Sequence, residues 1–141
     1  MALVKVPEAN VAWTESAMVK HKHADIGVAV SIPGGLITPI VRAAETRKLK
    51  PEECLGGSCS VSNMGMMGVK NFSAIVNPPQ ASILAVGAGE RRPVVRGNEI
   101  MIEQQMSVTL STDHRCIDGA LGAEFLGAIK MYLEEPALML V

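Results

Sequence analysis

A strand, a charged loop and a helix follow one another near the end of the chain, and this unit most constrains the fold. The apolar run 106–110 is rich in β-forming residues and predicts a strand. The segment Ser111–Ala120 then gathers charged residues around His114. After it, apolar residues recur every four positions, as one buried helix face requires. The repeating residues are Leu121, Phe125, Ile129 and Leu133.

Short apolar runs separated by turn residues fill most of the rest of the chain. Hairpins are predicted over 11–19 and over 93–102, the second turning at Gly97-Asn98. The other predicted strands are 25–32, apolar on both faces and hence buried, and 36–41, 58–63, 71–76, 81–87 and 104–111. Residues 42–53 are charged and predict a short helix or loop.

Two helical segments complete the outline. Residues 2–6 are typical of the last turn of a helix, and Asp118 is placed to cap the C-terminal helix that Pro136 ends. The pattern predicts one α/β (α+β) domain over residues 1–141, with a mixed or largely antiparallel sheet rich in hairpins.

Charge and composition exclude two classes of partner. Basic and acidic residues number 13 and 14, and aromatic residues make up 3%, so no basic, base-stacking surface for nucleic acid is expected. No apolar run is long enough to cross a membrane. Because nine methionines and a mean hydropathy of +0.26 leave apolar surface to cover, we expect a homo-oligomer.

Cysteine and histidine spacing argues against a metal site. Cys54, Cys59 and Cys116 form no CxxC pair, and His21 and His23 have no third ligand nearby in sequence. Because the chain also opens without a secretory apolar segment, we expect a reducing compartment, either bacterial cytoplasm or mitochondrial matrix.

The surroundings of His114 support two interpretations. The ring could be structural, bonded to backbone and to Asp113 or Asp118, or it could act as a general base. Arg115 is expected to be an ion-pair partner and Cys116 a buried structural thiol. Ser62 by itself indicates nothing.

Several stretches taken together are far more specific. The first is Asp113-His114-Arg115 with Asp118-Gly119-Ala120; the others are 24–30, 34–41, 60–65 and 70–80. In this order they resemble the catalytic domain of the dihydrolipoyl acyltransferases, the core subunits of 2-oxo-acid dehydrogenase complexes. The likeness is strongest to the acetyltransferases of pyruvate dehydrogenase complexes. It implies a mixed-sheet fold like that of chloramphenicol acetyltransferase.

The resemblance also implies a reaction, acyl transfer between a dihydrolipoyl thioester and coenzyme A. His114 would take the proton from the coenzyme A thiol, because a thiol becomes a strong nucleophile only when deprotonated. Ser62 would donate a hydrogen bond to the tetrahedral oxyanion, from the neighbouring subunit. Asp118 would help hold the site in shape. The lipoyl group would come from a separate domain, and no metal is implied.

Family members form trimers with active-site channels between subunits, and the trimers build hollow cubic or dodecahedral cores. The implied partners are further copies of this chain, lipoyl domains and the other subunits of the dehydrogenase complex.

The sequence departs from the family pattern: the N-terminal part of the catalytic domain, a helix near residues 46–48, and the lipoyl and peripheral-subunit-binding domains are expected to be missing. Two alternatives therefore stay open, a non-catalytic structural subunit and an inactive, poorly folding fragment. The acyl group, acetyl over succinyl or branched-chain, is also open.

Overall fold

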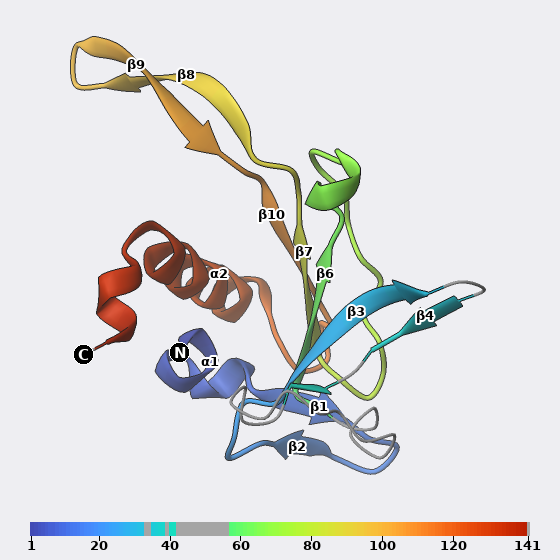
Figure 1. The fold of residues 1–141 in the computed structure, drawn as a ribbon. Helices are drawn as coiled ribbons and strands as arrows, with labels where there is room; N and C mark the ends of the chain where they lie inside the picture. The colour runs from blue at the N-terminus through green and yellow to red at the C-terminus, as the bar shows by residue number, and fades with distance from the viewer. Residues whose placement is uncertain (33–34, 39, 42–56, 141) are drawn as a thin grey trace.

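A six-stranded mixed sheet forms the centre of the protein (Figure 1), as the sequence predicts. The computed structural model describes residues 1–32, 35–38, 40–41 and 57–140. The sheet order is β10-β7-β6-β3-β4, and β5 also pairs with β3. The strands are β3 (Ile26–Ile32), β4 (Gly35–Ile37), β5 (Ile40–Val41), β6 (Cys59–Asn63), β7 (Ser82–Val86) and β10 (Val108–Thr112). β3, β6 and β7 are parallel, whereas β4, β5 and β10 pair antiparallel to their neighbours.

Two hairpins lie outside this sheet, and both are predicted by their turn residues. β1 (Val11–Trp13) pairs with β2 (Met18–Lys20), and β8 (Glu90–Arg96) pairs with β9 (Glu99–Gln105). The turn between β8 and β9 contains Gly97 at φ 62, a backbone conformation that favours glycine. The β8–β9 hairpin projects away from the sheet (Figure 1).

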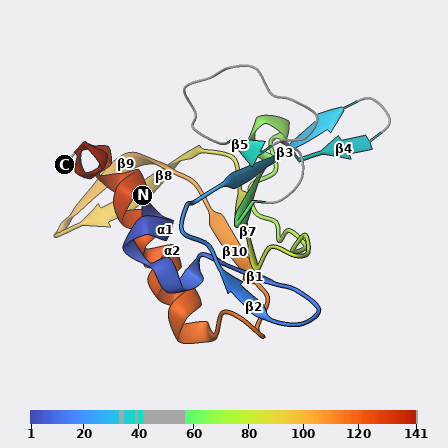
Figure 2. The ribbon, with the colours of Figure 1, turned by 90° about the horizontal axis from the view of Figure 1, so that it is seen from below.

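Helices gather on one side of the molecule. α2 (Gly119–Glu134) begins at Asp118 and is followed by the 3-10 turn η4 (Pro136–Met139), which confirms the predicted helix start and end. The short α1 (Ala2–Lys5) lies beside α2 in both views (Figures 1 and 2) and continues into η1 (Pro7–Ala9). A third 3-10 turn, η3 (Gly65–Met67), follows β6. Within the described residues, no helix has the length and apolar character needed to span a membrane.

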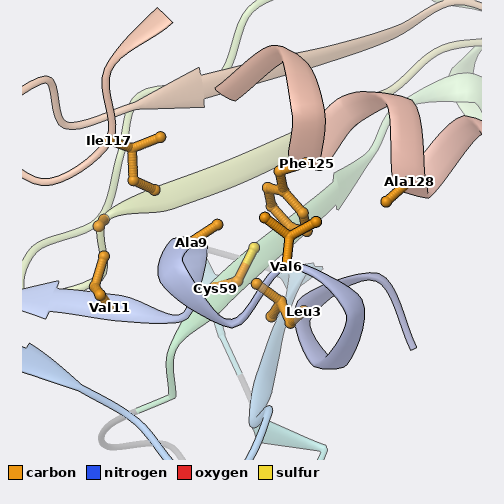
Figure 3. Packing of buried hydrophobic residues seen from close by; sticks show 9 residues of the cluster. Leu3, Val6, Ala9, Val11, Cys59, Ile117, Phe125 and Ala128 are labelled. Carbon is orange, nitrogen blue, oxygen red and sulfur yellow. The ribbon is translucent and has the colours of Figure 1, made fainter. Parts of the chain in front are cut away.

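The main core cluster lies where these helices meet the sheet. Phe125 and Ala128 of α2 pack with residues of α1, η1, β1 and β6 (Figure 3). The other buried members are Leu3, Val6, Ala9, Val11, Cys59, Ala81 and Ile117. Burying one large side chain such as Phe125 contributes about 1.5–3 kcal/mol. Leu133, predicted on the buried stripe, is instead 47% exposed, because the last turn of α2 faces a groove toward the β8–β9 hairpin.

Four strand predictions need correction. The segment 71–76 alternates in burial but pairs with no strand among the described residues, and the Asn77-Pro78-Pro79 run after it offers few backbone donors. The run 104–111 is split between β9 and β10 because Ser107 leaves its strand and accepts the N–H of Gly87.

The other two corrections concern β3 and its neighbours. β3 is only partly buried, with Val30 40% exposed, so its two apolar faces are not both covered within one chain. The run 36–41 is divided between β4 and β5. Residues 42–56, which include the whole predicted charged segment 42–53 and Cys54, lie outside the described residues.

Candidate functional site

The loop that carries His114 is tied to the sheet by backbone hydrogen bonds. At its start, the N–H of Asp113 donates to the carbonyl of Ala81 at 2.8 Å. The Asp113 carbonyl then accepts the N–H groups of Cys116 at 2.9 Å and Ile117 at 3.0 Å, which closes a tight turn. Ile117 is fully buried in the core cluster. The loop is therefore anchored at both ends, with His114 at its outer part.

An ion pair spans the histidine. Arg115 donates from Nη2 to Oδ2 of Asp113 at 2.6 Å and from Nε to Oδ1 at 3.0 Å. These hydrogen bonds lower the pKa of the Asp113 carboxyl. The Arg115 guanidinium also lies 4.9 Å from the centre of the Trp13 ring, within cation–π range. Arg115 is thus the expected ion-pair partner, and Trp13, which sequence reasoning placed only on a strand, also supports the loop.

His114 itself is exposed, and among the described residues no hydrogen bond or ion pair engages its ring. In the structural interpretation, the ring would bond the carboxylate of Asp113 or Asp118, but both carboxylates bind other groups. Asp113 bonds Arg115, and Asp118 accepts the N–H of Leu121 at 2.8 Å as the N-cap of α2. The structure therefore leaves the imidazole accessible for proton transfer, as the general-base interpretation requires.

Ser62 lies near the end of β6, between β3 and β7. Its neighbours across the two parallel pairings are Ala29 and Ala85, so small side chains flank it on both sides. The serine is half-buried, and its hydroxyl has no hydrogen-bond partner among the described residues. The next residue, Asn63, accepts the N–H of Gly65 through its side chain at 2.9 Å, which turns the chain out of the sheet.

The sheet does not bring Ser62 and His114 together within one chain. Ser62 pairs with Ala85 of β7, and Ala85 pairs with Thr109 of β10. His114 follows five residues after Thr109, on the order of 15 Å along an extended chain. Figure 1 shows the same separation, because η3 lies at one end of the sheet and the loop between β10 and α2 at the other.

The remaining sequence candidates that the structure describes provide no alternative centre. Cys59 is buried as a core residue, and burial raises the pKa of its thiol. Cys116 is half-buried rather than buried as predicted. No group of three or more metal-ligating side chains occurs in the described part of the chain.

A groove of about 1050 Å³ separates the β8–β9 hairpin from α2. Neither His114 nor Ser62 lines it, so these candidate residues lie outside this groove.

A family model for the 2-oxoacid dehydrogenase acyltransferase catalytic domain matches residues 1–49 and 42–141. The two matched segments overlap at 42–49, the region in which a helix of the family is expected to be missing. A dihydrolipoyllysine-residue acetyltransferase component of the pyruvate dehydrogenase complex from Rhizobium meliloti (strain 1021) is 63% identical over 160 positions. That alignment covers 100% of this chain of 141 residues, so 19 positions have no counterpart here. It covers 36% of the relative, so the chain spans about a third of that protein's length.

Solved structures show the same likeness. A dihydrolipoamide acetyltransferase of Azotobacter vinelandii has a TM-score of 0.89 and 27% identity, covering 99% of this chain and 66% of that one. Its crystallographic and enzymatic study concerns a serine, a histidine and an asparagine in the catalytic mechanism, spaced 52 and 4 positions apart. The cubic core of a pyruvate dehydrogenase multienzyme complex matches with a TM-score of 0.89 and 26% identity, covering 99% and 66% of the two chains.

Proposed function

This chain belongs to the 2-oxoacid dehydrogenase acyltransferase family, and from that premise we propose that it transfers an acyl group, acetyl first among the candidates, between a dihydrolipoyl thioester and coenzyme A. The observation that carries the proposal is the accessible imidazole of His114 in a loop fixed on both sides. The protein would work as a core subunit of a pyruvate dehydrogenase complex in bacterial cytoplasm or mitochondrial matrix. Its 63% identical relative is the component of that name from Rhizobium meliloti.

His114 is the proposed general base. Its ring would take the proton from the coenzyme A thiol, so that the thiolate can attack the carbonyl carbon of the acyl-dihydrolipoyl thioester. The tetrahedral intermediate then collapses, the bond between that carbon and the dihydrolipoyl sulfur breaks, and the imidazolium returns its proton to the departing sulfur. The exposed, unengaged ring fits this double use, because both steps need a nitrogen that no neighbour already occupies.

Ser62 is the proposed oxyanion donor. In the Azotobacter vinelandii enzyme the serine precedes the histidine by 52 positions and the asparagine follows it by 4. Ser62 precedes His114 by 52 positions, and Asp118 follows His114 by 4. The Ser62 hydroxyl would donate a hydrogen bond to the oxygen that becomes negative in the intermediate. Removing one such donor typically lowers the rate about 10²–10³-fold.

Asp118 would support the site through the helix that it caps. Its carboxylate already accepts the Leu121 N–H, so its contribution is to fix where the histidine loop ends and α2 begins. Asparagine, present at the corresponding spacing in the Azotobacter vinelandii enzyme, is an equally good N-cap residue.

Because Ser62 and His114 are far apart in one chain, each active site would combine residues of two copies. One thioester carbonyl cannot reach both ends of the same sheet, since reacting atoms must approach to about 3 Å. We therefore propose a homo-oligomer built of trimers, assembled into a larger core that receives lipoyl domains. The cubic core with a TM-score of 0.89 supports an assembly of this kind.

The surface that would join the copies is apolar. On the β8–β9 hairpin, the exposed large apolar residues are Val95, Ile100, Met101 and Ile102. Leu133 of α2, which lines the groove, and Leu138 and Met139 of η4 are also exposed. Exposed apolar patches of this kind mark protein interfaces. A second copy is the proposed occupant.

The test is acetyl transfer from acetyl-dihydrolipoamide to coenzyme A, with His114→Ala measured beside the unmodified chain. We expect turnover in the unmodified chain and its loss in the variant, with the same particle mass by light scattering. A chain that assembles but neither binds nor acetylates coenzyme A would instead be the non-catalytic structural subunit.

A further inference from the structure

Gln80 lies in the segment 79–81, which is paired with β1 and with the residue that begins the histidine loop, and we propose that it is a positioning residue for His114. The inference rests on the proposed acyl-transfer function for its catalytic consequence. The structural part, that one buried amide fixes the start of this loop, stands on contacts within the chain.

The side chain of Gln80 occupies a closely fitted space. It is 3% exposed, and its carbonyl oxygen accepts the hydroxyl of Ser60, a fully buried residue of β6. Its amide nitrogen lies close to two glycines, of which Gly57 must lack a side chain to leave room for it. A Cβ at Gly27 would lie 3.4 Å from this nitrogen, and one at Gly57 would lie 2.9 Å from it. The Gln80 side chain is thus closely packed and hydrogen-bonded to β6.

The residues on either side of Gln80 hold the loop. The carbonyl of Pro79 accepts the N–H of Trp13 at 2.8 Å, and the carbonyl of Ala81 accepts the N–H of Asp113 at 2.8 Å. Gln80 itself bridges to Ala12 in an antiparallel pairing. Residues 79–81 therefore connect β1 with the end of β10 at the point where the histidine loop begins.

These two attachments converge on the neighbours of His114. The Arg115 guanidinium lies over the Trp13 ring, and Asp113 accepts hydrogen bonds from the same guanidinium. If residues 79–81 shift, both supports of the loop shift together. The amide of Gln80 is what joins these residues to β6 and so prevents such a shift.

The experiment compares Gln80→Met, which keeps the length of the side chain but removes the amide, with Glu124→Met on the exposed face of α2 as a matched control. Two quantities are measured: hydrogen exchange of the Asp113 amide by NMR, and kcat and KM for coenzyme A. In Gln80→Met we expect the exchange rate of the Asp113 amide to increase relative to the unmodified chain, and to increase more than that of Leu84 in the middle of β7. We also expect kcat to be about 10–100-fold lower with KM unchanged. Glu124→Met should match the unmodified chain.

Ser60→Ala keeps the measurement possible if Gln80→Met does not fold, because it removes only the hydroxyl partner of Gln80. It should show the same selective exchange at Asp113, with a smaller fall in kcat. Exchange that is unchanged at Asp113, or faster to the same degree throughout the sheet, would overturn the proposal. If the unmodified chain transfers no acetyl group, the proposed function fails, while the exchange data still decide whether Gln80 fixes the loop.

Discussion

Ser62 and His114 lie at opposite ends of the central sheet, with β7 between their strands. The pairing of Ser62 with Ala85, and of Ala85 with Thr109, fixes this separation. The separation is therefore set by the register of the strands. This register is strongly specified, because a shift of one strand by one residue would turn each of its side chains to the other face of the sheet. Under the proposed function, one chain would therefore present half of a site at each end.

The first prediction is complementation between two inactive variants. His114→Ala and Ser62→Ala should each lose most transfer activity when assembled alone. Copies of the two variants refolded together in equal amounts should regain about one quarter of the normal sites, because each such site needs an intact histidine from one copy and an intact serine from its neighbour. The measurement is acetyl transfer by the mixture. A mixture no more active than either variant alone would mean that the two residues do not share a site across copies.

The sequence predicts well those parts of the fold that local residues determine. Three signals of this kind involve residues only a few positions apart: the Gly97-Asn98 turn, the Asp118 cap and the apolar spacing from Leu121 to Ile129. The structure has the corresponding hairpin and helix. The segment 71–76 misleads because its alternating pattern is that of a strand, although no described strand pairs with it. Pairing depends on partners distant in sequence, which the pattern alone does not contain.

The candidate site divides in the same way. His114 and its ion-pair neighbours are contiguous in sequence, so their motif is recognisable there. The separation of Ser62 from His114 depends on the register of three strands, and the support from Trp13 joins residues about a hundred positions apart. Neither relationship can be inferred from spacing.

The second prediction concerns acid stability. Arg115 lowers the pKa of Asp113 below its ordinary 3.8, so this interaction stabilises the folded chain above that pH and is lost as the pH falls through the folded-state pKa. Asp113→Asn should therefore be slightly less stable than the unmodified chain at pH 7. The difference should shrink below pH 3.8 and disappear as the pH falls through the lower folded-state pKa. The effect should be small because Arg115 is largely exposed to solvent. Urea unfolding across this pH range measures it, and a difference independent of pH would contradict the assignment.

The third prediction concerns the thiols. Burial raises the pKa of Cys59, so its reactive thiolate form is disfavoured in the folded chain and water-soluble reagents cannot reach it. Labelling followed by peptide mass mapping should modify Cys116, which is half-buried, well before Cys59. Because the folded-state pKa is raised, the contribution of Cys59 to stability should be complete below pH 9.0 and decline at higher pH. Equal labelling rates would show that the core around Cys59 opens readily.

The fourth prediction separates the two roles of Asp118. Asp118→Ala removes the acceptor for the Leu121 N–H and should lower the free energy of unfolding by about 1 kcal/mol. Asp118→Asn keeps a side-chain oxygen at the same place, so its stability in urea unfolding should be close to that of the unmodified chain. If Asp118 acts in catalysis only by fixing the start of α2, Asp118→Asn should also keep most acetyl-transfer activity, whereas Asp118→Ala should lose part of it. Loss of activity in Asp118→Asn with unchanged stability would mean instead that the negative charge itself acts in the reaction, beyond capping the helix that follows His114.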